Sequence, residues 1–148
     1  MTERLLANRI LWIAAFALIA IGGAIYIIYR PQSILVFRIS DALGLASQVN
    51  SIRNLALLFP MPNFVIYSLP AGLWTASYLM IMYCNTAALD IKTRLILSLP
   101  LPVCAIILEF MQLVGWCPGT FDVYDLICYF VPLIIFIKSI NNEKTRRI

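Results

Sequence analysis

The sequence contains no histidine and very little charge. Only 12% of its 148 residues are Asp, Glu, Lys or Arg, against about 25% in an ordinary soluble domain. The absence of histidine excludes the commonest general base, the commonest zinc ligand and every Ser-His catalytic arrangement. Hydrophobic residues make up 62% of the chain. This composition leaves too little polar surface for a water-soluble domain, so it is typical of a protein that crosses a membrane several times.

Cysteine is also scarce, and its spacing does not indicate a metal site. No two of the four cysteines form a Cys-x-x-Cys motif, and three of them fall inside strongly apolar runs. We interpret all four as small apolar residues. We therefore expect no metal and no cofactor. The four are Cys84, Cys104, Cys117 and Cys128.

Four apolar runs meet or approach the roughly 20 residues that a membrane-spanning helix needs. They lie at about 10–29, 70–89, 95–114 and 122–137. The first run has no small-x-small cleavage site before Arg30, so we expect it to be retained as a span. The sequence thus predicts an all-α fold, a polytopic membrane helix bundle with four transmembrane helices that form a single domain over residues 1–148.

Basic residues are unevenly divided between the two sides of such a bundle. With the N-terminus in the cytoplasm, eight of the 11 Lys and Arg residues lie inside and three lie outside. The positive-inside rule therefore predicts that both termini are cytoplasmic. A net charge of +4 is explained by this distribution, and we expect no nucleic-acid partner. The three outer residues are Arg30, Arg38 and Arg53.

The outer segment at about 33–59 is long and largely apolar. Within 45–59, apolar residues recur at helical spacing and polar residues take the other face. This pattern predicts an amphipathic helix lying in the outer membrane interface. Residues 33–43 form a second candidate helix, in which Arg38 and Asp41 have the spacing of an i, i+3 pair. A plain connecting loop is the alternative, although loops of this length are uncommon.

The stretch LEFMQLVGWCPGTFDVYDL, residues 108–126, contains three of the seven acids. Glu109 and Gln112 are three residues apart, so they share a helix face. A carboxylate inside a span is costly unless it faces the bundle interior, pairs with another group or is protonated. Glu109 is therefore a candidate functional residue. The alternative is a structural strut that locks the third span to its neighbours.

Asp122 and Asp125 open the fourth run, directly after a turn at Pro118-Gly119-Thr120. Their spacing resembles a capping box, so helix capping alone is one explanation for both acids. The turn is also too short to separate the third and fourth spans. We therefore expect both acids to converge with Glu109 and Gln112 on the outer side of the membrane.

A basic residue and an aromatic ring would complete this site. Arg53 lies on the predicted amphipathic helix, and we expect it to dock over the acids in preference to Arg38. Trp116 continues the face of Glu109 and Gln112 and offers a surface for stacking on a sugar or a lipid head group. An ordinary interfacial aromatic belt is the alternative explanation for such residues. The predicted ligand-binding set is Glu109, Gln112, Asp122, Asp125, Arg53 and Trp116.

The spacing of these polar residues resembles the signature of the VanZ-like family. Glu109-x-x-Gln112, a short turn and Asp122-x-x-Asp125 match a pattern found in these small bacterial integral membrane proteins, which are named for a member linked to teicoplanin resistance. The resemblance covers about residues 95–137. It implies a place in the bacterial cytoplasmic (inner) membrane and a role in the cell envelope or in antibiotic resistance.

Three positions depart from the family pattern. Gly119 stands where an arginine is often found, Tyr129 stands where an asparagine is expected, and Pro132 stands near an expected glycine. The resemblance therefore implies where the protein acts and does not imply which reaction it catalyses. Whether the protein is an enzyme stays open.

Three functions remain as alternatives. The first is an envelope protein whose outer-leaflet acidic pocket binds an envelope precursor, a glycopeptide antibiotic or a lipid head group. The second is a membrane enzyme that acts on a lipid-linked substrate. The third is a non-catalytic subunit of a larger membrane complex or transporter. The expected partners are membrane lipids, a lipid-linked precursor or glycopeptide, and a membrane protein.

Overall fold

The computed structural model describes residues 2–30, 42–56 and 58–147. Over these residues the chain is all-α, with seven helices, as the composition predicted. The helices are α1 (Thr2–Tyr29), α3 (Ala46–Ala56), α4 (Asn63–Tyr67), α5 (Leu69–Asn85), α6 (Ile91–Ser98), α7 (Pro100–Leu113) and α8 (Val123–Arg147).

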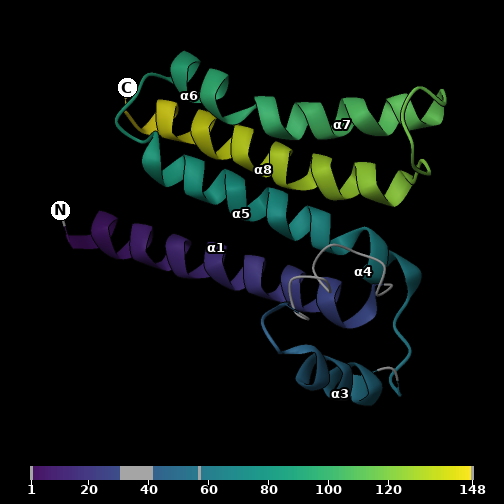
Figure 1. Cartoon of the computed structure of the whole chain (residues 1–148). Coiled ribbons are helices and arrows are strands. Elements are labelled where there is room, and N and C mark those ends of the chain that lie inside the picture. The colour runs from purple at the N-terminus through teal and green to yellow at the C-terminus, as the bar shows by residue number, and fades with distance from the viewer. Residues whose placement is uncertain (1, 31–41, 57, 148) are drawn as a thin grey trace.

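The long helices lie side by side in the order α1, α5, α8 and the α6–α7 pair (Figure 1). Helix α5 packs against α1 on one side and α8 on the other, and α7 packs against α8. The N- and C-termini lie at one end of this arrangement, and α3, α4 and the turn between α7 and α8 lie at the other end (Figure 1). We call these the termini end and the turn end.

Two or three helical segments are long and apolar enough to cross a membrane. Leu6–Tyr29 and Val123–Glu143 each qualify alone, and α6 with α7 would form a third span across a 44° bend. Large apolar side chains such as Ile13 (69% exposed) and Ile135 (60% exposed) face outward, as expected of a surface in contact with lipid. By their length and composition, these two or three candidate spans suggest a multi-pass membrane protein.

The predicted span at 70–89 corresponds to α5, which is shorter than expected. Helix α5 has 17 residues and ends at Asn85, so it falls just below the length of the other candidate spans. A helix of 17 residues is about 25 Å long, somewhat less than the roughly 30 Å hydrocarbon core of a bilayer. The described structure thus shows two or three candidate spans, where the sequence predicted four.

Prolines and a cap divide the α6–α7 segment. Asp90 caps α6, because its carboxylate accepts a hydrogen bond from the Thr93 backbone N–H at 3.0 Å. Pro100 opens α7, and Leu99 separates it from α6. Proline lacks the N–H that a continuous helix requires at this point, and the segment bends by 44° there. Pro100 and Pro102 lie in the first two turns of the apolar run at 95–114, so the sequence predicts a kink or a delayed helix start there, and the bend confirms the kink.

Glycines allow close packing at two contacts of α5. A Cβ on Gly22 in α1 would lie 2.7 Å from Trp74 Nε1, and a Cβ on Gly72 would lie 2.8 Å from the Cys128 Cβ of α8. A Cβ on Gly23 would meet open space. Of the Gly22-Gly23 pair in the first span, only Gly22 therefore lies at a close helix contact.

The helix expected at 45–59 is present as α3, over Ala46–Ala56. Arg53 is buried, and its Nη1 donates a hydrogen bond to the Ile27 carbonyl of α1. Apolar side chains, among them Ile52 and Leu55, are exposed. The second helix expected at 33–43, with its Arg38–Asp41 pair, lies almost entirely outside the described residues.

Candidate functional site

Glu109 is the most deeply buried acid of the stretch that the sequence singled out. It lies on α7 and is 5% exposed. Its Oε2 atom is buried and makes no hydrogen bond to any residue that the structure describes. A buried polar atom without a partner costs about 1–3 kcal/mol, and more when it is charged. Glu109 is therefore poorly explained as a satisfied structural strut.

Asp122 and Asp125 have different roles at the start of α8. Asp122 Oδ1 accepts a hydrogen bond from the Tyr124 backbone N–H at 2.8 Å, so Asp122 caps the helix as expected. Asp125 does not complete a capping box. Its Oδ1 atom is buried and has no hydrogen-bond partner within the described part of the chain. Capping accounts for the first acid and leaves the second unexplained.

The three acids lie close enough for their charges to interact. The negative charges of Asp125 and Asp122 both act on Glu109, and the Asp122 backbone N–H also acts on it. The Ser68 hydroxyl, which is fully buried, lies beside the Asp125 carboxyl group and acts on it as a hydrogen-bond donor. Side chains from α7, α8 and the α4–α5 junction therefore meet at one place.

Gln112, one turn after Glu109 on α7, packs against Gly119 in the α7–α8 turn. A Cβ on Gly119 would lie 2.7 Å from Gln112 Cδ, and Gly119 has a φ of 137°. Both observations require glycine at position 119, because any other residue would strain the backbone and its Cβ would clash with the Gln112 side-chain amide. Gly119, which differs from the family pattern, is thus explained by the packing of Gln112.

The basic residue near the acids is Arg30, whereas the sequence predicted Arg53 in this place. Arg30 Nη2 donates to the Tyr67 carbonyl at 2.9 Å, and the positive charge of Arg30 acts on Asp125. The guanidinium lies over the rings of Tyr26 and Tyr67, at 5.2 and 4.8 Å. Arg53 instead bonds to α1, as described above. From the sequence, Arg30 could have been identified as a candidate for this site by its position at the outer end of the first predicted span.

The aromatic residues divide between the site and its surroundings. Trp116 lies in the α7–α8 turn and is 77% exposed, so the structure does not pack it into the group of acids. Tyr129, on α8, is affected by the charges of Asp125 and Glu109. Ser68 was not predicted as a member of the site, since a serine does not mark a site on its own, and Tyr129 was noted only as a departure from the family pattern.

A second polar cluster at the termini end was not foreseen. Arg94, 1% exposed, forms an ion pair with Glu143 at 2.7 Å between Nη1 and Oε2. Its Nε donates to Thr86 Oγ1, and its guanidinium lies 5.0 Å from the Tyr83 ring centre. The Tyr83 hydroxyl donates to Glu143. These groups satisfy one another, so the cluster joins α5, α6 and α8 structurally.

Neither polar cluster forms a metal site. Within the described residues, no group of three or more Cys, Asp or Glu side chains is arranged to hold a metal ion. The turn-end group, consisting of Glu109, Asp122, Asp125, Ser68, Arg30 and Gln112, is the stronger candidate for ligand binding. We call it the turn-end pocket.

Comparison with known proteins assigns no family to the chain. No protein-family model, no curated protein and no solved structure matches it.

Proposed function

We propose that the protein is a bacterial inner-membrane protein resembling the VanZ-like family, with four spans and both termini in the cytoplasm. Two observations support this topology. The termini lie at the same end of the helix arrangement, as an even number of crossings requires (Figure 1). Helix α5 lies between α1 and α8, both of which are candidate spans. The residues of the turn-end pocket then lie on the outer side of the membrane.

We further propose that the turn-end pocket binds an amine- or hydroxyl-bearing group of a cell-envelope molecule. The single observation that carries this proposal is that two buried carboxylate oxygens, one of Glu109 and one of Asp125, have no hydrogen-bond partner among the described residues. Buried oxygens of this kind are rare in folded proteins and call for an explanation. A ligand that donates hydrogen bonds would satisfy both carboxyl groups.

The charge balance of the pocket narrows the chemistry of the ligand. The negative charges of Asp125 and Asp122 both act on Glu109, and Arg30 offsets part of the charge on Asp125. Such a site suits an ammonium group, or the hydroxyls of a sugar. Envelope precursors, glycopeptide antibiotics and lipid head groups all carry one or both of these groups.

Binding to defined envelope molecules tests the proposal. The full chain would be purified in mild detergent and examined by native mass spectrometry with three probes: phosphatidylethanolamine, an undecaprenyl-linked disaccharide-pentapeptide and teicoplanin. We expect at least one probe to bind, and Glu109→Gln and Asp125→Asn each to weaken its binding about tenfold. Asp90→Asn is the matched control, because Asp90 is an exposed acid that caps α6, and α6 lies at the termini end (Figure 1).

Two results would contradict the proposal that the turn-end pocket binds such a ligand. Equal binding by the wild type and both pocket variants would show that neither carboxyl group contacts the ligand. If none of the three probes binds to the folded wild-type chain, the proposed classes of ligand are excluded.

A further inference from the structure

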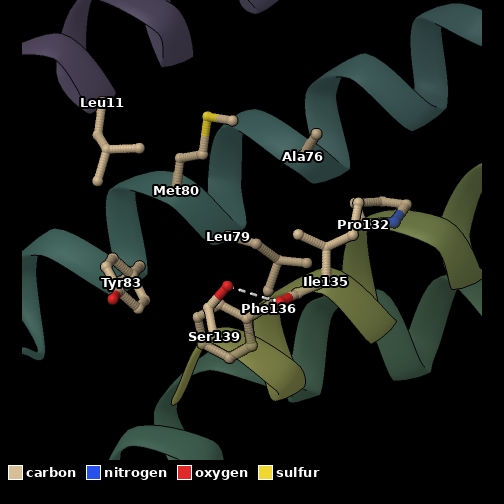
Figure 2. Close-up of a pocket in the computed structure, with 9 residues that line it drawn as sticks. All are labelled: Leu11, Ala76, Leu79, Met80, Tyr83, Pro132, Ile135, Phe136 and Ser139. Carbon is tan, nitrogen blue, oxygen red and sulfur yellow. Dashed lines mark hydrogen bonds between the residues drawn. The ribbon is translucent and has the colours of Figure 1, made fainter. Parts of the chain in front are cut away.

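Polar groups without partners distinguish the turn-end pocket from an apolar groove between α1, α5 and α8. The groove has a volume of about 310 Å³ and is lined mostly by aliphatic and aromatic side chains (Figure 2). The hydroxyl groups that line it are engaged within the protein, because Ser139 donates to the Ile135 carbonyl and Tyr83 donates to Glu143. By contrast, the turn-end pocket contains buried polar atoms without hydrogen-bond partners among the described residues, and one of these atoms is a donor.

Arg30 supplies this donor. Its Nε atom is buried and makes no hydrogen bond within the described part of the chain. Its Nη2 atom donates to the Tyr67 carbonyl at 2.9 Å, and the guanidinium carbon lies 5.2 and 4.8 Å from the ring centres of Tyr26 and Tyr67. These cation–π contacts and the hydrogen bond hold the guanidinium in place, but none of them neutralises its charge. Arg30 is therefore positioned while N–H groups of its guanidinium remain available to an acceptor.

Arg30 and Asp125 are neighbours that do not pair with each other. The Tyr67 carbonyl that accepts from Arg30 belongs to the residue directly before Ser68, and the Ser68 hydroxyl lies beside the Asp125 carboxyl group. Arg30 is close enough for its charge to act on Asp125, yet no ion pair joins it to an acid among the residues that the structure describes. Arg30 Nε and Asp125 Oδ1 therefore both lack a partner although they belong to the same pocket.

A free donor beside free acceptors suits a ligand that carries groups of both kinds. An ammonium group would donate to the unpartnered oxygens of Asp125 and of Glu109, whose side chain is only 5% exposed. The guanidinium of Arg30 is matched by an oxyanion, because its planar N–H groups form charge-assisted hydrogen bonds with phosphate oxygens. At the surface of a membrane, the head group of an ethanolamine phospholipid carries an ammonium group and a phosphate that are joined by a short ethylene link. This head group therefore offers a partner to each of the unpaired groups.

We propose that the turn-end pocket binds a phosphoethanolamine group, with the phosphate on Arg30 and the ammonium group on Asp125 and Glu109. This inference rests on the proposed function of the pocket and narrows its ligand to one that carries a phosphate beside an N–H donor. Arg30 selects the phosphate and fixes the orientation of the ligand, while the two acids select the ammonium group. A ligand with only one of the two groups binds more weakly than a ligand with both.

Native mass spectrometry of the purified wild-type chain tests this pairing without any substitution. Three probes share a single apolar chain: oleoyl lysophosphatidylethanolamine carries both groups, oleoyl lysophosphatidylcholine keeps the phosphate but has no N–H, and oleylamine has the ammonium group but no phosphate. We expect the first probe to be retained about tenfold more than either of the others, because each of those lacks one set of charge-assisted hydrogen bonds. Soluble O-phosphoethanolamine separates the two sources of this group. Its binding would support a free ligand, and binding of the lipid alone would support a membrane lipid.

Substitutions then assign the two groups of the ligand to their residues. Arg30→Gln should reduce retention of the lysophosphatidylethanolamine about tenfold and leave retention of oleylamine unchanged, because only the phosphate loses its partner. Asp125→Asn should remove the preference for the ethanolamine lipid over the choline lipid. Lys92→Gln replaces an exposed basic residue on α6, so it is the matched control for the loss of one positive charge and should behave as the wild type. Thermal unfolding in detergent shows whether each variant is folded.

Failure of this inference differs from failure of the proposed function. Equal retention of oleylamine and lysophosphatidylethanolamine by the wild type would overturn the role of the phosphate, while loss of both in Asp125→Asn would keep the pocket as an amine site. Unchanged retention of the ethanolamine lipid in a folded Arg30→Gln variant would also overturn the inference. Retention of none of these probes would overturn it even if an envelope precursor or teicoplanin binds to the pocket.

Discussion

Arg94 and Glu143 lie 49 residues apart in the sequence, yet Arg94 Nη1 is 2.7 Å from Glu143 Oε2. This ion pair ties α6 to the last turns of α8, at the end of the molecule that carries both termini (Figure 1). The two partners differ in exposure. The Arg94 side chain is 2% exposed and the Glu143 side chain is 28% exposed, so losing one partner does not have the same consequence as losing the other.

Glu143→Ala should destabilise the protein more than Arg94→Met. Removing one partner of a buried ion pair typically costs roughly 3–5 kcal/mol, and Glu143→Ala leaves the buried Arg94 charge without its counter-charge. Arg94→Met keeps an apolar side chain at the buried position and leaves Glu143 partly hydrated, so its cost should be smaller. Thermal unfolding in detergent measures both. A larger loss for Arg94→Met would contradict this account, and Lys92→Met on the same helix is the control.

Gly72→Ala should lower the thermal stability of the protein. The new Cβ would lie 2.8 Å from Cys128 Cβ and 3.1 Å from the Cys128 carbonyl oxygen, and the α8 backbone cannot easily move away. Overpacking of this kind costs about 1–3 kcal/mol. Gly23→Ala is the control, since its Cβ would meet open space. Equal melting temperatures for the two variants would show that α5 and α8 are not held at this distance.

Asp90 gives the cap of α6 a defined dependence on pH. Hydrogen bonds from the Thr93 hydroxyl and the Thr93 backbone N–H hold the pKa of Asp90 below its ordinary value of 3.8. Ionised Asp90 therefore stabilises the fold above that value, and the contribution is lost as the pH falls through the folded-state pKa.

Melting temperatures at pH 6 and pH 3 check this behaviour in the wild type and in Asp90→Asn. Asparagine is also a good cap, so we expect the two proteins to be similar at pH 6. The wild type should lose more stability than the variant at pH 3. An identical drop in both would mean that other groups account for the acid sensitivity.

The proposed topology predicts which positions a membrane-impermeant reagent reaches in intact cells. In a background with all four native cysteines replaced, Thr120→Cys lies in the exposed α7–α8 turn and Asn142→Cys lies near the C-terminal end of α8. We expect maleimide labelling of the first from outside. The second should label only after the membrane is permeabilised. Labelling of Asn142→Cys in intact cells would reverse the orientation or change the number of spans.

The all-α fold could be predicted from the sequence, because long apolar runs leave few alternatives to a helix. Pro100 located the bend in the third run, and Asp122 located the start of α8, since each acts through local backbone chemistry. The length of α5 was overestimated by four residues at its end. Residues 86–89 are apolar enough to extend the run, but the Thr86 hydroxyl bonds back to the Met82 carbonyl at the end of the helix.

The partners of the polar residues were harder to foresee. Glu109 and Asp125 could be placed on neighbouring helices, because the turn between them is short. Which arginine approaches them depends on how α1 and α4 pack, and spacing along the chain carries no such information. The Arg94 cluster was missed for the same reason. Its partner Glu143 lies beyond the predicted end of the fourth span at about 137, and no partner for Arg94 was predicted from the sequence.

Replacing Glu109 separates a binding role from a structural one. Glu109 is 5% exposed, and its Oε2 atom lacks a hydrogen-bond partner in the described structure, so a neutral or apolar residue should be tolerated there. Glu109→Leu removes the unpaired oxygen and the repulsion from Asp125. Buried charges replaced by apolar residues of similar size often leave stability unchanged or improve it.

We therefore expect Glu109→Leu and Glu109→Gln to accumulate in the membrane and to melt at or above the wild-type temperature, while both lose ligand binding. Membrane fractionation with quantitative blotting and thermal unfolding in detergent measure the first two properties. Gln112→Leu is the informative comparison, because the Gln112 amide packs against Gly119 in the turn, and its loss should lower stability. If the two Glu109 variants instead fail to accumulate while Gln112→Leu accumulates normally, Glu109 is a structural lock between α7 and α8, and the turn-end pocket loses the residue on which the proposal chiefly depends.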